Sequence, residues 1–219
     1  MISISGKHWS EKKIDKNLVE KLAQKENFSQ ILSKLIISRQ FDDEEIYSIN
    51  NETEITNVFK SNNDYQLSLD LVFNSIINKE KICILGDYDV DGSVSTSLLV
   101  NFFKKINHPY FFYIPDREKD GYGASVDLFK KLITKDPKLV ILVDCGSNSH
   151  DAINYLNKNK IKSLIIDHHQ INKPFPIANA IINPKKDNGY IQYDYLCATT
   201  LTYFFLDLLV KKLIDKKFL

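Results

Sequence analysis

The stretch that decides the fold is "ICILGDYDVDGSVSTSLL", residues 82–99. It opens with a short apolar run of the kind that forms a buried strand, and it closes with an amphipathic run typical of a helix. Asp87, Asp89 and Asp91 stand at alternate positions where the strand gives way to the helix. Because like charges repel and burial makes each carboxylate costly, three aspartates at the end of a buried strand require an explanation.

The same change from an apolar run to an amphipathic run recurs along the rest of the chain. Apolar runs occupy residues 81–87, 110–115, 138–144, 161–167 and 179–184, and helical patterns occupy residues 93–106, 125–133, 150–160 and 195–214. Strands that alternate with helices favour a mainly parallel sheet with helices on both faces. We therefore expect an α/β domain over residues 79–219, with a sheet of about five strands.

The first 78 residues have a different pattern. Apolar residues recur at spacings of three and four in the ranges 17–25, 28–41, 42–49 and 64–79, which indicates helices. The polar range 48–64 is typical of a loop or a short linker. We expect residues 1–78 to form a helical N-terminal segment that packs on the core.

The composition is that of a folded protein, since 43% of the 219 residues are hydrophobic and the formal net charge is +1. No apolar run approaches the roughly 20 residues that span a bilayer, and the first residues lack the pattern of a signal peptide. Cys83, Cys145 and Cys197 are far apart and form no CxxC pair, which suits a reducing compartment. We expect a soluble, cytoplasmic protein with no membrane partner, in which Cys83 and Cys197 are small core residues.

A parallel sheet of this kind binds its ligands beyond the carboxyl ends of its strands. Four of the expected strands are followed there by polar stretches: "GDYDVDG" (86–92), "PDREKDGYG" (115–123), "DCGSNS" (144–149) and "DHHQ" (167–170). Acidic, imidazole, arginine and glycine residues are therefore predicted to meet at one edge of the sheet.

Asp144, Asp167, His168 and His169 follow the third and fourth expected strands. Carboxylates gathered at one edge cannot all ionise without a cation between them. A mixed set of carboxylates and imidazoles suits Mn²⁺, Fe²⁺, Co²⁺ or Zn²⁺, and there are enough ligands for two ions. Each piece alone is also typical of a helix cap, a turn or a core histidine, so the prediction of a metal pair depends on their convergence.

Arginine is scarce: of the 29 basic residues, only Arg39 and Arg117 are arginines. Arg117 lies just before Gly121 and Gly123, a place where a planar, two-pronged donor and a close backbone approach would both suit a phosphate group. The alternative is a surface salt bridge of Arg117 with a neighbouring acid and a plain loop at the glycines. We favour the phosphate contact.

Together, "GDYDVDG", "DREKDGYG", "VDCGS", "IDHH" and "AIINP" resemble, in order and spacing, the DHH phosphoesterase superfamily and, within it, the RecJ family of single-strand-specific 5′ to 3′ DNA exonucleases. The likeness extends over roughly residues 30–215. It implies hydrolysis of phosphodiester bonds in single-stranded DNA with two divalent ions, Mn²⁺ or Mg²⁺, and a role in DNA repair and recombination. It also implies a single-strand-binding protein or a helicase as partner.

The resemblance also implies roles for individual residues. The expected catalytic residues are Asp89, Asp91, Asp144, His168 and His169, with Asp144 bridging the ions. The expected metal-binding residues are Asp87, Asp89, Asp91, Asp144 and His168, held in place by Asp167 and His169. The expected contacts to substrate phosphate are Arg117, Gly121, Tyr122 and Gly123.

Two departures from the family pattern stand out. Thr199 and Thr200 replace small or glycine residues, so we expect the last helix to be loosened or redirected. The chain stops at Leu219, before the family's next metal-binding aspartate, its DHHA1 domain and its oligonucleotide-binding domain, which implies a truncated catalytic core.

Two alternative functions stay open. A small-substrate DHH phosphoesterase, of the oligoribonuclease or pyrophosphatase type, usually has a histidine four residues before the first aspartate of its DxD pair. Leu85 holds that position before Asp89, which favours the RecJ type. A non-catalytic RecJ-like scaffold would have lost the acidic motifs, which this chain retains.

Overall fold

The computed structural model describes residues 2–8, 10, 12–51, 57–60, 62–121, 123–186 and 188–219. The chain divides into two compact units, one that ends at Thr56 and one that runs from Asn57 to Leu219. This division falls earlier than the boundary expected at residue 78, because helix α4 (Asn63–Ile77) packs against strand and helix elements of the second unit. That the N-terminal segment packs on the core stays a prediction.

The first unit holds three helices, α1 (Lys16–Glu26), α2 (Gln30–Arg39) and α3 (Asp43–Asn50). Each begins after a side chain that accepts a hydrogen bond from a backbone N–H of the first turn, which stabilises the helix start. These capping residues are Asp15, Ser29 and Asp42. A small apolar cluster of Leu22, Phe28 and Ile36 holds the helices together. The expected helices at 17–25, 28–41 and 42–49 are confirmed.

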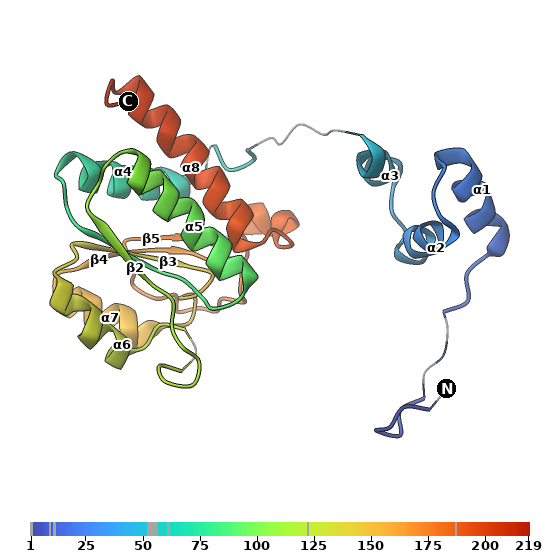
Figure 1. The fold of residues 1–219 in the computed structure, drawn as a ribbon, viewed down its shortest axis with the longest axis horizontal. Helices are drawn as coiled ribbons and strands as arrows, with labels where there is room; N and C mark the ends of the chain where they lie inside the picture. The colour runs from blue at the N-terminus through green and yellow to red at the C-terminus, as the bar shows by residue number, and fades with distance from the viewer. Residues whose placement is uncertain are drawn as a thin grey trace. The chain divides into compact units, whose positions relative to one another are not determined.

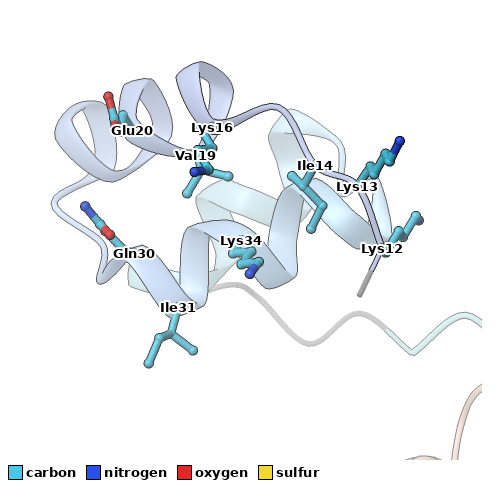
Figure 2. A pocket seen from close by; sticks show the side chains of 9 residues that line it. All are labelled: Lys12, Lys13, Ile14, Lys16, Val19, Glu20, Gln30, Ile31 and Lys34. Carbon is cyan, nitrogen blue, oxygen red and sulfur yellow. The ribbon is translucent and has the colours of Figure 1, made fainter. Parts of the chain in front are cut away.

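A surface hollow of about 950 Å³ lies within this first unit. Its lining comes from the extended segment before α1, from α1 itself and from α2 (Figure 2). We call it the lysine hollow, and its lining residues are Lys12, Lys13, Ile14, Lys16, Val19, Glu20, Gln30, Ile31 and Lys34.

The second unit contains one sheet of five parallel strands in the order β2-β1-β3-β4-β5. The strands are β1 (Ile82–Leu85), β2 (Tyr110–Tyr113), β3 (Leu139–Val143), β4 (Lys162–Ile166) and β5 (Ala180–Ile182). In register, Leu85 lies opposite Leu142, which in turn lies opposite Ile165. Strands β1, β3 and β4 therefore end at the same edge, as the sequence predicted.

Helices cover both faces of the sheet (Figure 1). The face above it in that view carries α4, α5 (Val90–Lys105) and α8 (Ala198–Asp215), and the opposite face carries α6 (Val126–Leu132) and α7 (His150–Lys158). Two short 3-10 turns, η1 (Ile133–Lys135) and η2 (Asn188–Tyr193), lie between these helices and strands in the described part of the chain. The expected α/β fold with helices on both faces is confirmed.

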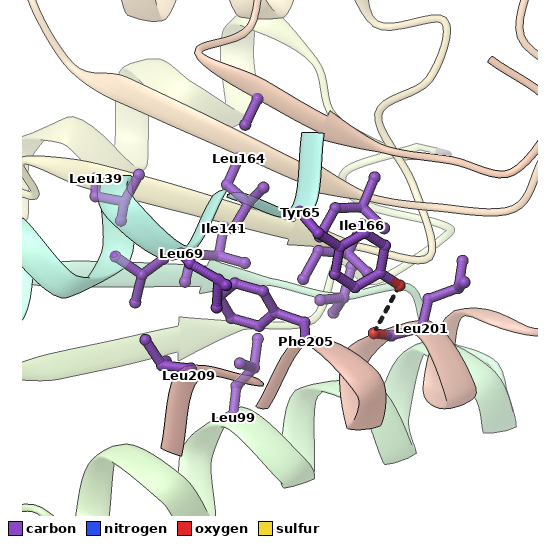
Figure 3. Packing of buried hydrophobic residues seen from close by; sticks show 14 of the residues in the cluster. Tyr65, Leu69, Leu99, Leu139, Ile141, Leu164, Ile166, Leu201, Phe205 and Leu209 are labelled. Atoms are coloured by element: carbon purple, nitrogen blue, oxygen red, sulfur yellow. Dashed lines mark hydrogen bonds between the residues drawn. The ribbon is translucent and has the colours of Figure 1, made fainter. Parts of the chain in front are cut away.

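Alternate strand residues feed two separate cores, one on each face. In β3, Ile141 packs with the cluster beneath α4, α5 and α8, whereas Leu142 packs with the cluster beneath α6 and α7. Figure 3 shows the first cluster, in which the Tyr65 hydroxyl donates a hydrogen bond to the Leu201 carbonyl oxygen at 3.4 Å. A sheet buried on both faces explains why its strands are continuous apolar runs in the sequence.

Two expectations about single features can be settled here. Cys83 is fully buried in β1, as expected, but Cys197 is only half-buried, because it lies directly before the first turn of α8. Among the described residues, no helix combines the length and the hydropathy that crossing a membrane requires.

Candidate metal centre

Two groups of possible metal ligands lie at the carboxyl edge of the sheet, and Asp144 belongs to both. One group is Asp87, Asp89 and Asp144, and the other is Asp144, His168 and His169. Within each group the ligand atoms all lie within 4.8 Å of one another. The structure therefore brings together five of the residues that the sequence placed at the site, from the ends of β1, β3 and β4.

Asp144 follows β3 directly and is only 1% exposed. Its backbone has a φ of 59°, the left-handed region that aspartate and asparagine tolerate better than most residues. Among the described residues, neither of its carboxylate oxygens accepts a hydrogen bond of good geometry, and the His168 ring nitrogen Nε2 lies 3.3 Å from Oδ1. A buried carboxylate without hydrogen-bond donors is costly unless a cation completes its surroundings.

The electrostatics of Asp144 agree with this geometry. Burial raises its pKa from 3.8 to about 6, and the nearby carboxylates of Asp91 and Asp89 act in the same direction, while His168 opposes them. A carboxyl group that is hard to ionise by itself becomes a strong ligand once a divalent ion neutralises it.

His169 is held by the buried carboxylate of Asp167. His169 Nδ1 lies 2.7 Å from Asp167 Oδ1, and this contact raises the pKa of His169 to about 9. Burial opposes the ionisation of Asp167, but its hydrogen bonds with His169 and Ser147 outweigh burial and lower its pKa to about 2. The same nitrogen, Nδ1, lies 3.9 Å from Asp144 Oδ1, so the contact with Asp167 holds the His169 ring beside the carboxylate that both ligand groups share.

The loop after β1 presses closely against the start of α5. Asp89 accepts a hydrogen bond from the Gly92 N–H at 2.9 Å and caps α5. A Cβ atom at Gly92 would lie 2.6 Å from backbone atoms of Asp87, so only glycine fits there. The helix-cap alternative for Asp89 is thus correct, and its carboxylate still belongs to the ligand group.

Asp91 has a different role from the two aspartates before it. Its two carboxylate oxygens accept hydrogen bonds from the Ala198 and Thr199 N–H groups, each at 2.7 Å, at the first turn of α8. Burial opposes ionisation, but these bonds and the Thr199 hydroxyl lower the pKa of Asp91. Asp91 belongs to neither of the two ligand groups found among the described residues, although its Oδ2 lies 3.6 Å from His168 Nε2. Its role as a metal ligand stays a prediction.

Thr199 fastens α8 to α5, which is the opposite of the loosening that we expected. Its hydroxyl donates to the Asp91 carbonyl oxygen at 3.2 Å and lies 3.2 Å from the Ser95 hydroxyl. A glycine or alanine at this position could not make these contacts. The expected loosening is wrong at Thr199, because it considered the small size of the usual residue and not the hydroxyl group; a change in the direction of the helix stays a prediction.

Three polar residues that the sequence pattern assigned no role hold the "DHH" segment in place. The Ser147 N–H donates to Asp167 at 3.0 Å. The Asn183 side-chain amide donates to the Ser147 hydroxyl at 2.8 Å and to the His169 carbonyl oxygen at 2.9 Å. Lys185 Nζ donates to the His168 carbonyl oxygen at 2.6 Å. The signal for Asn183 was present in the sequence, because this residue is part of the "AIINP" motif. Its side-chain amide contacts the segment that carries the histidines.

The expected phosphate-binding residues lie on the loop after β2. Arg117 is exposed, and its guanidinium lies over the Tyr88 ring, 5.1 Å from the centroid, and donates to the Tyr88 hydroxyl. Gly121 and Gly123 have φ values of 80° and 68°. This left-handed backbone is sufficient reason for glycine at both positions. Tyr122 lies outside the described residues, and phosphate contact by this loop stays a prediction.

A smaller hollow of about 300 Å³ adjoins the site, and its lining includes Gly123, Ser147, Asp167 and His169. Cys145 also lines it, but burial raises the pKa of its thiol well above 9, which makes it a poor nucleophile. The site therefore combines acidic and imidazole ligands with open space beside them.

The residues present fit divalent metal binding. Asp144 is buried, its oxygens are unpartnered, and it belongs both to an all-carboxylate group and to a group with two imidazoles. Carboxylate and imidazole donors together suit such ions.

Comparisons with known proteins show which proteins the chain is similar to. The chain is similar to the single-stranded-DNA-specific exonuclease RecJ of Bacillus subtilis, with 28% identity over 185 residues, which make up 83% of this chain and 23% of the relative. It is 34% identical to RecJ of Haemophilus influenzae over 118 residues, 53% of this chain and 20% of the relative. The chain thus spans less than a quarter of the length of these curated relatives.

Solved structures show the same fold. The chain is similar to the crystal structure of exonuclease RecJ bound to manganese, with a TM-score of 0.64 and 21% identity over 73% of this chain and 40% of that chain. It is also similar to RecJ in complex with Mn²⁺ from Thermus thermophilus, with a TM-score of 0.65 and 17% identity over 90% of this chain and 27% of that chain.

A match to a family model decides the family. Residues 81–219, well over half of the chain, match the N-terminal domain of the DHH family. This range begins immediately before β1 and includes each strand of the sheet and every residue of both ligand groups. Because the sequence matches this family model over most of its length, the chain belongs to the DHH family, and its parallel sheet and clustered acidic and histidine side chains lie within the matched range.

Proposed function

We propose that this chain is the catalytic core of a metal-dependent exonuclease of the RecJ type, which hydrolyses phosphodiester bonds of single-stranded DNA in the 5′ to 3′ direction. The observation that carries the proposal is Asp144, a buried carboxylate with unpartnered oxygens that belongs to two ligand groups at once. Two metal sites that share one carboxylate suit in-line attack on phosphorus. The RecJ relatives supply the choice of substrate.

In this proposal Asp87, Asp89 and Asp144 hold one ion, and Asp144, His168 and His169 hold the other. The ions, when bound, would supply a more acidic water and stabilise the charge that develops on the phosphoryl oxygens. Asp167 keeps the Nδ1 proton of His169 and so fixes the ring. A protonated His169 ring has to release a proton before it can act as a ligand, so ion binding through this residue would be coupled to proton release.

The substrate contacts are proposed on the loop after β2. Arg117 would bind two oxygens of one phosphate group, since its guanidinium is exposed and its orientation is set by the Tyr88 ring. Gly121, Tyr122 and Gly123 would let the backbone approach the strand. The same proposal includes Mn²⁺ or Mg²⁺ as the ion and a role in DNA repair and recombination. It also includes a cytoplasmic location and a single-strand-binding protein or a helicase as partner.

The test is an assay of the purified chain with 5′-labelled single-stranded DNA and Mn²⁺. We expect release of mononucleotides, abolished by EDTA and by Asp144→Asn, with duplex DNA of the same sequence degraded far more slowly. Calorimetric titration with Mn²⁺ should show binding that Asp144→Asn removes. Ion binding without hydrolysis of DNA would support the scaffold alternative, and unchanged Mn²⁺ affinity in the variant would refute the shared role of Asp144.

The small-substrate alternative has less support. Leu85 is fully buried in the core beneath α6 and α7, where it packs with other apolar side chains, and it offers no ligand atom. Hydrolysis of pyrophosphate by the chain in the same assay would nevertheless favour that alternative.

A further inference from the structure

Asp120 is an acidic residue of the loop after β2, close to Arg117 in the sequence and outside both ligand groups. Its side chain is only 4% exposed, although residues 116–119 just before it are exposed. A carboxylate that an exposed loop turns inward needs hydrogen-bond donors to offset the loss of water.

The donors to Asp120 come from three different parts of the chain. The Tyr113 hydroxyl, at the end of β2, donates to Oδ2 at 2.6 Å, and Lys131 Nζ, on α6, donates to Oδ1 at 3.1 Å. The Asp116 N–H, within the loop, donates to Oδ2 at 3.2 Å. The bonds from Tyr113 and Lys131 lower the pKa of Asp120, so the group is a carboxylate at neutral pH and its hydrogen bonds are charge-assisted.

The attachment on the sheet side is part of the β-ladder. Tyr113 lies opposite Leu85 in the parallel register, and its carbonyl oxygen accepts a hydrogen bond from the Gly86 N–H at 3.1 Å. The end of β2 is therefore joined to the strand that leads into the first ligand group. Through Tyr113, Asp120 fastens the loop after β2 to that edge of the sheet.

Arg117 lies inside a closed turn formed by residues 116–120. The Asp120 N–H donates to the Asp116 carbonyl oxygen at 2.7 Å. Asp120 thus closes the turn with its backbone and fastens it with its side chain, while the Tyr88 ring holds the guanidinium of Arg117. A charged group that is held in place before its ligand arrives loses less entropy on binding.

We infer that Asp120 is a positioning residue, which fixes the turn that carries Arg117 and so holds the guanidinium ready for a substrate phosphate. This inference rests on the phosphate contact proposed for Arg117. Asp120 is itself negative and would repel a phosphate, so it acts through the turn and not by contact. The alternative is a plain ion pair with Lys131, which would affect neither the turn nor the binding of substrate.

The first test compares Tyr113→Phe with Tyr110→Phe in the full chain. Tyr113→Phe removes one hydrogen bond to Asp120 and leaves the loop sequence unchanged. Tyr110→Phe removes a hydroxyl from the other end of β2, where the ring packs with the core beneath α4, α5 and α8. Amide hydrogen exchange of residues 116–120 is measured in EDTA by mass spectrometry. Exchange should be about tenfold faster in Tyr113→Phe, the effect of losing one hydrogen bond to a charged group, and unchanged in Tyr110→Phe. Exchange at the wild-type rate in Tyr113→Phe would overturn the inference.

The second test asks whether the turn serves Arg117. Binding of fluorescein-labelled oligothymidylate in EDTA is followed by fluorescence anisotropy, so hydrolysis plays no part. Asp120→Ala removes a negative charge, which by itself would strengthen the binding of phosphates, whereas a positioning role predicts binding about tenfold weaker. Tyr113→Phe, which changes no charge, should weaken binding as well, and Tyr110→Phe should not.

The same assay in the Arg117→Ala background isolates the action through Arg117. There Asp120→Ala should cause no further loss of affinity. An equal loss without Arg117, or binding in Asp120→Ala that is as strong as in wild type, would overturn the inference. A wild-type chain that does not bind the oligonucleotide would instead contradict the proposed function, and hydrogen exchange in Tyr113→Phe would then decide by itself whether Asp120 fixes the turn.

Discussion

Replacing Asp144 with asparagine should make the metal-free chain more stable at neutral pH. Burial raises the pKa of Asp144 to about 6 from an ordinary 3.8. The folded chain therefore binds this proton more tightly than the unfolded chain, and the contribution of Asp144 to stability is greatest below pH 3.8 and is lost as the pH rises through 6. A shift of about 2 pKa units corresponds to at most about 3 kcal/mol. Asparagine has no charge to bury and tolerates the left-handed φ of 59°.

The assay is urea unfolding of both proteins at pH 3.5 and pH 8, with EDTA or with Mn²⁺. In EDTA the variant should gain up to about 3 kcal/mol over wild type at pH 8 and nothing at pH 3.5. Mn²⁺ at about 1,000 times its Kd should reverse the order, because it stabilises the wild type by about 4.1 kcal/mol and the variant not at all.

Asp136→Asn is a matched control, because Asp136 also has a left-handed φ, of 54°, but is exposed and belongs to neither ligand group. It should show neither the gain at pH 8 nor the loss of Mn²⁺ stabilisation. A variant at Asp144 that is less stable than wild type at pH 8 in EDTA, or a difference that does not depend on pH, would refute the reasoning.

Three further predictions follow from single contacts. Gly92→Ala should lower the free energy of unfolding by about 1–3 kcal/mol, because its Cβ would lie 2.6 Å from the Asp87 backbone, and thermal melting will measure this. The pair of Asp167 and His169 stabilises the fold fully from about pH 4 to 6.5. Its contribution is lost as the pH rises through 9, where His169 titrates, and as the pH falls through 2, where Asp167 titrates. In His169→Gln, the pH profile of urea unfolding in EDTA should therefore lose both of these declines in stability. Arg117→Lys should raise the KM for single-stranded DNA more than it lowers kcat, since lysine cannot make the two-pronged contact.

The fold was predictable because its strands are buried on both faces. A strand in that position has to be apolar throughout, so the runs at 82–85, 139–143 and 164–166 stand out from the amphipathic helices between them. The order of the strands was not predictable in the same way. The position of β1 between β2 and β3 depends on pairing between residues far apart in the sequence. Ile84, for example, pairs with Phe112 on one side and with Ile141 on the other.

The ligand groups were predictable for a related reason. In a parallel sheet, residues that directly follow neighbouring strands meet at one edge, so the positions of Asp87, Asp144 and His168 in the sequence are enough to place them together. The supporting contacts were hidden because they are made by ordinary residue types. Ser147 and Asn183 have many uses in proteins, and only their distances to Asp167 and His169 show what they do.

Asp91 explains most about why three aspartates alternate after β1. Asp87 and Asp89 face the ligand group, but the oxygens of Asp91 are taken by two N–H groups of α8, more than 100 residues away. An aspartate that accepts hydrogen bonds from a helix start stabilises it by about 1 kcal/mol. Because each carboxylate oxygen has two lone pairs, these bonds still leave room for an ion, and Asp91 as a metal ligand stays a prediction. The third aspartate therefore ties the last helix to the loop that carries Asp87 and Asp89, a structural role that the alternating pattern alone did not indicate.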